Sequence, residues 1–228
     1  MNRLSDLNIS NQNLVIRVDM NVPIEDGVVT DNTRILACMP TIKFALKNNA
    51  KVLLVTHLGR PIEGTFDKKF SLKPVANEVT KILDREVDLI DDLDSAKIFN
   101  GSSDIQILEN IRFFEGEKIN CNKLGNLLSG LGDIYVFDAF GTSHREQSST
   151  HSAIINSNLS CAGLLLEKEI DSLTKVLNES QNPYTAIIGG AKVSTKLELI
   201  KNINSKADHI IVGGGIANTF LKAAGHEI

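Results

Sequence analysis

Short runs of aliphatic and β-branched residues alternate with stretches of helical spacing over the first part of the chain. Four of these runs suit buried strands and lie at residues 14–18, 51–56, 105–108 and 134–137. The stretches between them repeat apolar residues every three or four positions, which is typical of amphipathic helices. Strands separated by helices predict right-handed crossovers. The pattern therefore predicts a three-layer α/β fold, a mostly parallel sheet with helices on both faces.

Capping residues and proline predict where two of the helices begin. The first helix is expected to start at Asp31 or Asn32, and Pro40 predicts a kink or a fresh start inside it. Ser71 is expected to cap a second helix, whose apolar stripe runs over residues 72–83.

Three shorter segments connect these elements. Residues 67–70 are expected to form a loop, and residues 123–128 a short amphipathic helix. Asp26-Gly27 lies between two apolar pairs and predicts a small hairpin, which would bring Arg34 beside the end of the first strand. Taken alone, this segment fits a surface hairpin with solvated charges.

The pattern changes after residue 163. Residues 164–177 predict one long amphipathic helix that ends before Asn182-Pro183. Strands at 185–188 and 209–212 each lead into a glycine-rich turn and a helix, the last of which is expected to end near Gly225.

These segments predict three parts. Residues 1–163 form an N-terminal domain, residues 164–182 a connector helix, and residues 183–228 the start of a second, Rossmann-like α/β domain. A lone βαβ unit buries little apolar surface, so we expect a shortened form of a longer chain.

Polar and basic side chains follow all four strands of the first domain. They are Asp19 and Asn21 with Arg34, then His57 and Arg60, then Arg112, then His144 and Arg145; Arg17 is a further polar residue inside the first run. Ligands of parallel sheets bind at the carboxyl ends of the strands, where these groups are expected to meet. Clustered guanidinium groups repel one another unless an anion lies between them, and their fork geometry favours phosphate. Asp19 and Asn21 could accept a hydrogen bond from a hydroxyl of the same ligand.

The first glycine-rich turn, residues 189–196, is a second candidate site. Its backbone N–H groups could face a phosphate, and Lys192 and Lys196, four residues apart, are expected to share one helix face. The alternative is a tight strand-to-helix turn with solvated lysines, and the segment alone leaves both open. A Walker A loop would need glycine at Ser194 and lysine at Thr195.

Composition excludes several other classes of protein. The formal charge is -4 and the pI about 5.8, which gives no general attraction to nucleic acid or to an acidic membrane surface. The cysteines are odd in number and have no C-x-x-C spacing, so neither a disulfide framework nor a zinc site is predicted. Without a run of membrane-spanning length, a reducing cytoplasm is the expected location.

Several of these motifs resemble the phosphoglycerate kinase family. The matching runs are residues 17–23, 33–35, 57–61, 108–113, 138–142 with 144–145, 165–169, 189–193 and 213–215. They come in the family's order over nearly the whole chain, and several are very specific.

The resemblance implies a reversible phosphoryl transfer in glycolysis, between 1,3-bisphosphoglycerate and ADP, which gives 3-phosphoglycerate and ATP. ATP or ADP would carry Mg²⁺, and two domains would close around the substrates. The implied acid-binding residues are Asp19, Asn21, Arg34, His57, Arg60, Arg112 and Arg145. Arg34 and Lys192 would stabilise the phosphoryl group in flight, while Lys196, Gly190 and Gly215 would contact nucleotide.

The sequence departs from the family pattern in two respects. Met20 and Gln147 stand where members often have Phe and His, which we expect to alter packing and one peripheral contact. The family's adenosine pocket and its magnesium-positioning carboxylate are not represented, so we expect a chain that binds the acid but turns over little. A monomer is the expected oligomeric state.

Two other functions compete with this interpretation. The first is a non-catalytic anion-binding module that uses the same basic pocket. The second is a fragment of a nucleotide-binding oxidoreductase, disfavoured because Asn218 stands where G-x-G-x-x-G requires its last glycine.

Overall fold

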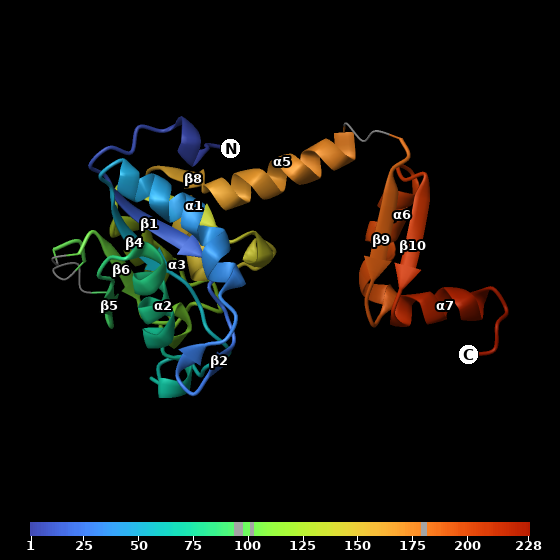
Figure 1. Cartoon of the computed structure of the whole chain (residues 1–228), viewed down its shortest axis with the longest axis horizontal. Helices are drawn as coiled ribbons and strands as arrows, with labels where there is room; N and C mark the ends of the chain where they lie inside the picture. Colours follow the sequence, from blue (N-terminus) through green and yellow to red (C-terminus); the bar gives the residue numbers. More distant parts are fainter. Residues whose placement is uncertain (94–97, 101–102, 179–181) are drawn as a thin grey trace. The chain divides into compact units, whose positions relative to one another are not determined.

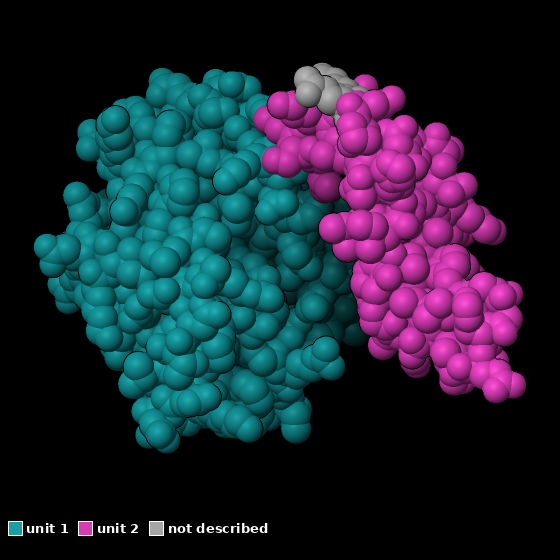
Figure 2. Space-filling view, turned by 45° about the vertical axis from the view of Figure 1, so that its right-hand side comes forward, with its two compact units in different colours: residues 1–169 teal, residues 170–228 magenta. Residues whose placement is uncertain are grey.

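The computed structural model describes residues 1–93, 98–100, 103–178 and 182–228. The chain divides into two compact units, Met1–Glu169 and Ile170–Ile228, coloured teal and magenta in Figure 2. The division falls inside one helix, and the three-part domain scheme expected from the sequence stays a prediction.

A six-stranded, all-parallel sheet forms the centre of the first unit (Figure 1). Its strands are β1 (Asn13–Val18), β4 (Lys51–Val55), β5 (Asp88–Ile90), β6 (Ile105–Leu108), β7 (Ile134–Asp138) and β8 (Ser160–Ala162). Their order is β5-β6-β4-β1-β7-β8. The four predicted strands are confirmed, whereas β5 and β8, at the two edges, were not predicted.

Helices cover both faces of this sheet, which confirms the predicted three layers. The helices are α1 (Thr33–Lys47), α2 (Lys73–Leu83), α3 (Asn122–Gly130) and α4 (Ala153–Asn156). On β1, Leu14, Ile16 and Val18 join the core that contains α1 and α2. Val15, which points to the opposite face, joins the core that contains α3 and α4. Alternate residues of β1 therefore pack into two different cores, one on each face of the sheet.

Two details around α1 and α2 differ from the prediction. The first helix continues through Pro40 without a fresh start. Residues Lys68–Phe70 form a short 3-10 helix, η2, capped by the Asp67 carboxylate, where a loop was expected. At α2 the cap position is Leu72, and the Ser71 hydroxyl accepts the N–H of Lys73 at 3.2 Å.

The expected hairpin is present. It consists of β2 (Ile24–Glu25) and β3 (Val28–Val29), which pair antiparallel. Both turn residues have positive φ, 49° at Asp26 and 76° at Gly27, the geometry that Asp-Gly turns favour.

In the described residues of the first unit, five single-turn helices are also present. They are η1 (Leu4–Asp6), η2, η3 (Ile111–Phe113), η4 (Phe140–Thr142) and the π-helix η5 (Ser148–Ser152).

The predicted long helix is α5 (Leu164–Asn178), and a buried aspartate fixes its start. Asp138, the last residue of β7, accepts hydrogen bonds from the Leu166 N–H at 2.9 Å and from the Thr41 hydroxyl at 2.6 Å. The Glu167 carboxylate accepts the hydroxyl of Ser5 at 2.9 Å. These bonds tie the first turn of α5 to β7, to α1 and to the N-terminal segment.

The second unit contains a parallel strand pair, β9 (Thr185–Gly189) and β10 (His209–Gly213). The short η6 (Val193–Lys196) and α6 (Leu197–Asn204) connect the two strands, and α7 (Gly215–Ala223) follows. The predicted end near Gly225 is confirmed, since this glycine has φ +92° and donates to the Lys222 carbonyl.

None of the helices in the described ranges combines the length and the apolar character that a membrane crossing needs.

Candidate functional site

The carboxyl ends of β1, β4, β6 and β7 meet at one edge of the sheet in the first unit. Arg17 of β1 is level with Val55 of β4 and Phe137 of β7, and Leu54 of β4 is level with Ile107 of β6. The polar residues that follow each strand therefore start from neighbouring positions.

Hydrogen bonds tie the loops after these strands to each other. The Met20 N–H donates to the Thr56 hydroxyl at 2.9 Å, and the Gly59 N–H donates to the Asn21 side-chain oxygen at 2.9 Å. Arg112, in turn, donates to the Gly59 carbonyl. Gly59 has φ +58° and lies against the ring of Phe70, so a side chain at this position would be strained and would clash.

Arg34 is delivered to this edge by the start of α1. Its guanidinium pairs with the Asp19 carboxylate at 2.7 Å, while 55% of its side chain stays exposed. Gly141, after β7, lies close to the same carboxylate, because a Cβ there would be 3.5 Å from Asp19 Oδ2. Asp19 thus orients one guanidinium and leaves it accessible to a ligand.

His57 lies inside a cluster of guanidinium groups. Burial, together with the positive charges of four nearby arginines, lowers the pKa of His57 to about 2. These four are Arg17, Arg112, Arg145 and Arg34. The imidazole is therefore neutral at physiological pH, and the positive charge of the site comes from the arginines.

Arg60 belongs to the same cluster, because its charge acts on Arg112. Burial lowers the pKa of Arg112, and the nearby charges of Arg145, Arg17 and Arg60 lower it as well. Arg112 is buried, Arg145 is half-buried, and Arg60 is exposed. The positively charged side chains of the cluster therefore range from buried to solvent-exposed.

The structure brings together all the residues that the sequence proposed for an acid pocket. These are Asp19, Asn21, Arg34, His57, Arg60, Arg112 and Arg145. Their roles in binding stay predictions.

Arg17 was noticed as a polar residue in the first strand but was not assigned to the site. It is 1% exposed, and its Nε donates to the Ser149 hydroxyl at 2.9 Å. The buried carboxylate of Glu117 attracts it. An arginine inside a run of buried aliphatic residues was the available signal, since such a charge needs partners in the fold.

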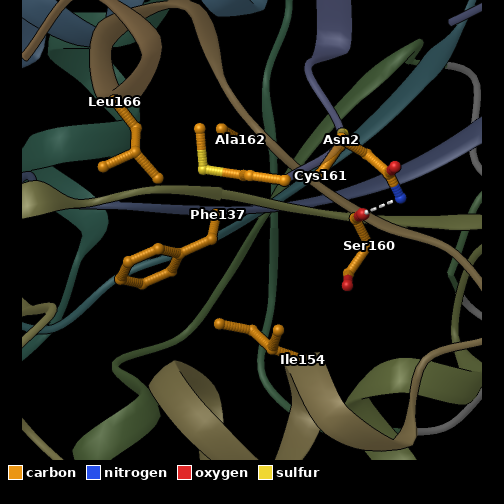
Figure 3. A pocket seen from close by; sticks show the side chains of 8 residues that line it. Asn2, Phe137, Ile154, Ser160, Cys161, Ala162 and Leu166 are labelled. Atoms are coloured by element: carbon orange, nitrogen blue, oxygen red, sulfur yellow. Dashed lines mark hydrogen bonds between the residues drawn. The ribbon is translucent and has the colours of Figure 1, made fainter. Parts of the chain in front are cut away.

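A separate hollow of about 460 Å³ lies beside β8 and the start of α5 (Figure 3). Figure 3 shows Phe137, Ile154 and Leu166 around it, and the Asn2 amide donates to the Ser160 carbonyl at 3.1 Å. Among the described residues that line this hollow there is no Lys, Arg or His, in contrast to the arginine cluster.

The two glycine-rich turns of the second unit lie against each other. Gly189 and Gly213 are level at the ends of β9 and β10. The Ile216 N–H donates to the Gly190 carbonyl at 3.0 Å, and a Cβ on Gly215 would lie 2.6 Å from the Ala191 carbonyl oxygen. Only residues without a side chain allow the two backbones to approach this closely.

The expectation that Lys192 and Lys196 share one helix face is wrong. Lys192 is extended, with φ -128° and ψ 121°, and residues Val193–Lys196 form a 3-10 helix before α6 begins at Leu197. The Lys196 side chain lies by Gly190 instead, because a Cβ on that glycine would be 3.2 Å from Lys196 Cε. The Lys196 side chain and Gly190 therefore lie together at the first turn. Gly215, at the second turn, packs against Ala191 of the first.

Within the described ranges, no group of three or more His, Cys, Asp or Glu side chains is placed to hold a metal ion.

Comparison with known proteins gives one consistent family. The family model described as phosphoglycerate kinase matches residues 4–228. A relative named phosphoglycerate kinase, from Desulfovibrio desulfuricans, is 48% identical over 226 residues, which cover 99% of this chain and 58% of the relative. The chain thus spans somewhat over half the length of the curated relatives it matches.

Two solved structures have the same fold. The phosphoglycerate kinase of Coxiella burnetii superposes with a TM-score of 0.89 and 44% identity, over 99% of this chain and 58% of the other. The phosphoglycerate kinase of Pyrococcus horikoshii gives a TM-score of 0.86 and 32% identity, over 100% of this chain and 58% of the other. The expected α/β fold is confirmed by both.

Proposed function

Since the chain belongs to the phosphoglycerate kinase family, we propose that its first unit binds 3-phosphoglycerate and 1,3-bisphosphoglycerate at the arginine cluster. The whole protein would transfer a phosphoryl group reversibly between 1,3-bisphosphoglycerate and ADP. The observation that carries the proposal is the set of four arginine charges acting on the single buried imidazole of His57. Such fixed cations suit a small ligand with several negative charges.

The phosphate and the hydroxyl group of the acid each have matching groups at the site. Arg60, Arg112 and Arg145 supply guanidinium donors for phosphate oxygens. Asp19 and Asn21 supply acceptor oxygens, which suit the ligand's hydroxyl group.

Arg34 is proposed to act on the phosphoryl group that is transferred. Its exposed guanidinium, oriented by Asp19, can stabilise negative charge as it redistributes in the transition state. Phosphoryl transfer depends on positioning and countercharge more than on covalent catalysis, so fixed cations are suitable catalytic groups.

The second unit is proposed to bind the diphosphate of the nucleotide. The backbone near Gly190 and Gly215 and the ammonium group of Lys196 would contact its phosphates. Lys192 would join Arg34 in stabilising the transferred group. Mg²⁺ would enter with ADP or ATP as part of that substrate. We place the reaction in cytoplasmic glycolysis and expect a monomer.

Calorimetric titration of the chain with 3-phosphoglycerate tests the acid site. Arg60→Ala and Arg145→Ala should each weaken binding by about 10- to 100-fold, because each removes a charge-assisted hydrogen bond of about 1.5–3 kcal/mol. Arg85→Ala is the matched control, since this exposed arginine lies by Asp104 and Ile105, away from the cluster. Binding by the parent chain that neither cluster substitution weakens would place the acid elsewhere.

A second assay separates the enzyme from a mere anion-binding module. The chain is joined to the segment of the Desulfovibrio relative that extends past the matched region, and ATP formation from 1,3-bisphosphoglycerate and ADP is measured. A joined protein that folds and binds 3-phosphoglycerate but forms no ATP would favour the binding module.

A further inference from the structure

We propose that Arg17, held in place by Ser149 and Glu117, positions His57 as a neutral ring that donates a hydrogen bond to the bound acid through Nε2. The identity of that acid rests on the proposed function. The protonation pattern of the ring rests on the buried hydrogen bonds alone.

The chain of hydrogen bonds ends at the acceptor Glu117, which is 1% exposed. Its carboxylate accepts the Ser149 hydroxyl at 2.6 Å and the Ser149 N–H at 2.9 Å. A hydroxyl group has a single proton, and that of Ser149 is used on Glu117. The Ser149 oxygen is therefore free to accept, and Arg17 Nε donates to it at 2.9 Å.

The same guanidinium determines which nitrogen of His57 carries the proton. Arg17 Nη2 lies 3.3 Å from His57 Nδ1. Arginine has five N–H donors and no acceptor, so Nδ1 must accept and has no proton. In a neutral imidazole the proton is then on Nε2.

The protonated nitrogen keeps some accessible surface. In the described part of the chain, no hydrogen bond is formed by Nε2, and no buried side-chain nitrogen or oxygen is without a partner. Nε2 must therefore be at the accessible part of a ring that is only 3% exposed. A donor in this position can meet a phosphate or carboxylate oxygen.

We call the hydrogen-bonded series of Glu117, Ser149, Arg17 and His57 the relay, and further contacts hold it in place. The Tyr135 hydroxyl donates to the Ser149 carbonyl at 2.6 Å, from a ring that is 1% exposed. A second Arg17 nitrogen donates to the Val18 carbonyl. Burial and the arginine charges keep the pKa of His57 at about 2, so the ring does not gain a second proton near neutral pH. Arg17, Ser149 and Glu117 are thus positioning residues, which act through His57.

Nitrogen-15 NMR of the imidazoles in the full 228-residue chain, without added acid, tests the assignment directly. The expected spectrum has His57 Nδ1 in the range of an unprotonated ring nitrogen and Nε2 in the range of a protonated one. A proton on Nδ1, or on both nitrogens at pH 7, would overturn the inference.

Two variants test whether the relay causes this pattern. Arg17→Met combined with Glu117→Gln removes both buried charges together and should convert His57 to a mixture of tautomers. Ser149→Ala should move the Nδ1 resonance and weaken 3-phosphoglycerate binding by about fivefold or more, because the Nε hydrogen bond of Arg17 is lost. If the double variant fails to fold, Ser149→Ala gives the decision.

Ser148→Ala is the matched control. Ser148 is as fully buried as Ser149, but its hydroxyl lies within hydrogen-bond distance of two carbonyls, 2.8 Å from Gly116 and 3.1 Å from Cys121, and in the described part of the chain it forms no hydrogen bond with Arg17. The control should leave both the spectrum and the affinity within about twofold of the parent. Equal effects of the two serine substitutions would show that the changes come from altered packing and not from the loss of the hydrogen bond to Arg17, and would overturn the inference.

The readouts distinguish failure of this inference from failure of the proposed function. The tautomer is measured without acid, so an Nδ1–H ring overturns the relay even if 3-phosphoglycerate binds. An Nε2–H ring in a chain that binds no 3-phosphoglycerate supports the relay and overturns the proposed ligand.

Discussion

His57 couples the charge of the site to the stability of the protein. Its pKa is about 2 in the folded chain, whereas an unfolded histidine has a pKa near 6.5. As pH falls below 6.5, His57 becomes protonated in the unfolded chain but stays unprotonated in the folded chain. The folded state therefore loses stability on the acid side.

The first prediction follows from this difference. Between pH 7 and pH 5, His57 should reduce the free energy of unfolding by about 2 kcal/mol, and His57→Gln should remove that part of the pH dependence. Urea unfolding of both proteins at several pH values measures it. Burial raises the pKa of Glu117 and Asp138 and gives the opposite trend, but both proteins share it. Parallel pH curves for the two proteins would show that His57 titrates normally.

Arg34 carries the second prediction, measured in the chain joined to the remainder of the Desulfovibrio relative. Arg34→Ala should lower kcat by about 10²–10³-fold and change the Kd of 3-phosphoglycerate by less than about tenfold, because its charge is used most in the transition state. Lys43→Ala, an exposed cation on the same helix, is the control. A loss of affinity equal to the loss in kcat/KM, at constant kcat, would contradict this role.

At the scale of elements, the start of α5 depends on close approach between Gly163 and Asp138. A Cβ on Gly163 would lie 2.4 Å from the Asp138 carboxyl carbon, a side chain already fixed by Thr41 and Leu166. The connection between β8 and α5, which contains Gly163, therefore has no room for a larger residue.

The third prediction uses this contact. Gly163→Ala should destabilise the chain by about 1–3 kcal/mol in urea unfolding, because the buried carboxylate must move away from its donors. At Gly130, in the last turn of α3, an added Cβ meets nothing within 4 Å. Gly130→Ala should consequently be neutral or stabilising by up to about 1 kcal/mol. Similar losses for both substitutions would rule out the specific contact with Asp138.

The elements that the sequence predicted well are those with a strong hydrophobic period. All four inner strands of the first unit, and β9 and β10 of the second, were predicted, whereas β5 and β8 were missed. Each of these has three residues and begins with a polar one, Asp88 or Ser160, so neither gives a recognisable run. The 3-10 geometry after Lys192 was also invisible, since spacing four residues apart assumes an α-helix.

At the scale of the molecule, the distribution of charge matters more than its sum. The chain has a formal net charge of -4, yet four of its arginines lie around His57. Their mutual repulsion should be relieved by a bound dianion.

The fourth prediction is therefore a specific effect of sulfate. Millimolar sodium sulfate should stabilise the chain more than sodium chloride of equal ionic strength, by about 1 kcal/mol, as expected from ligand linkage. In Arg145→Ala the excess should shrink, and only the general salting-out effect should remain. An excess of the same size in that variant would locate sulfate binding away from the cluster.

The convergence of basic residues could be predicted because parallel strands bring their carboxyl ends together. The support for these residues could not. Arg17 depends on Ser149, 132 residues further along the chain, and no local pattern connects the two. Long-range hydrogen bonds of this kind become visible only when the fold is known.

The strand order also has a consequence for how the protein is made. β1 lies between β4 and β7, and Leu14 pairs with Ile134, which is synthesised about 120 residues later. At ribosomal speeds of about 5–20 residues per second, the edge of β1 that pairs with β7 remains unpaired for roughly 6–24 s during synthesis. Translation rate, in addition to composition, thus determines how long this aliphatic edge is open to other nascent chains.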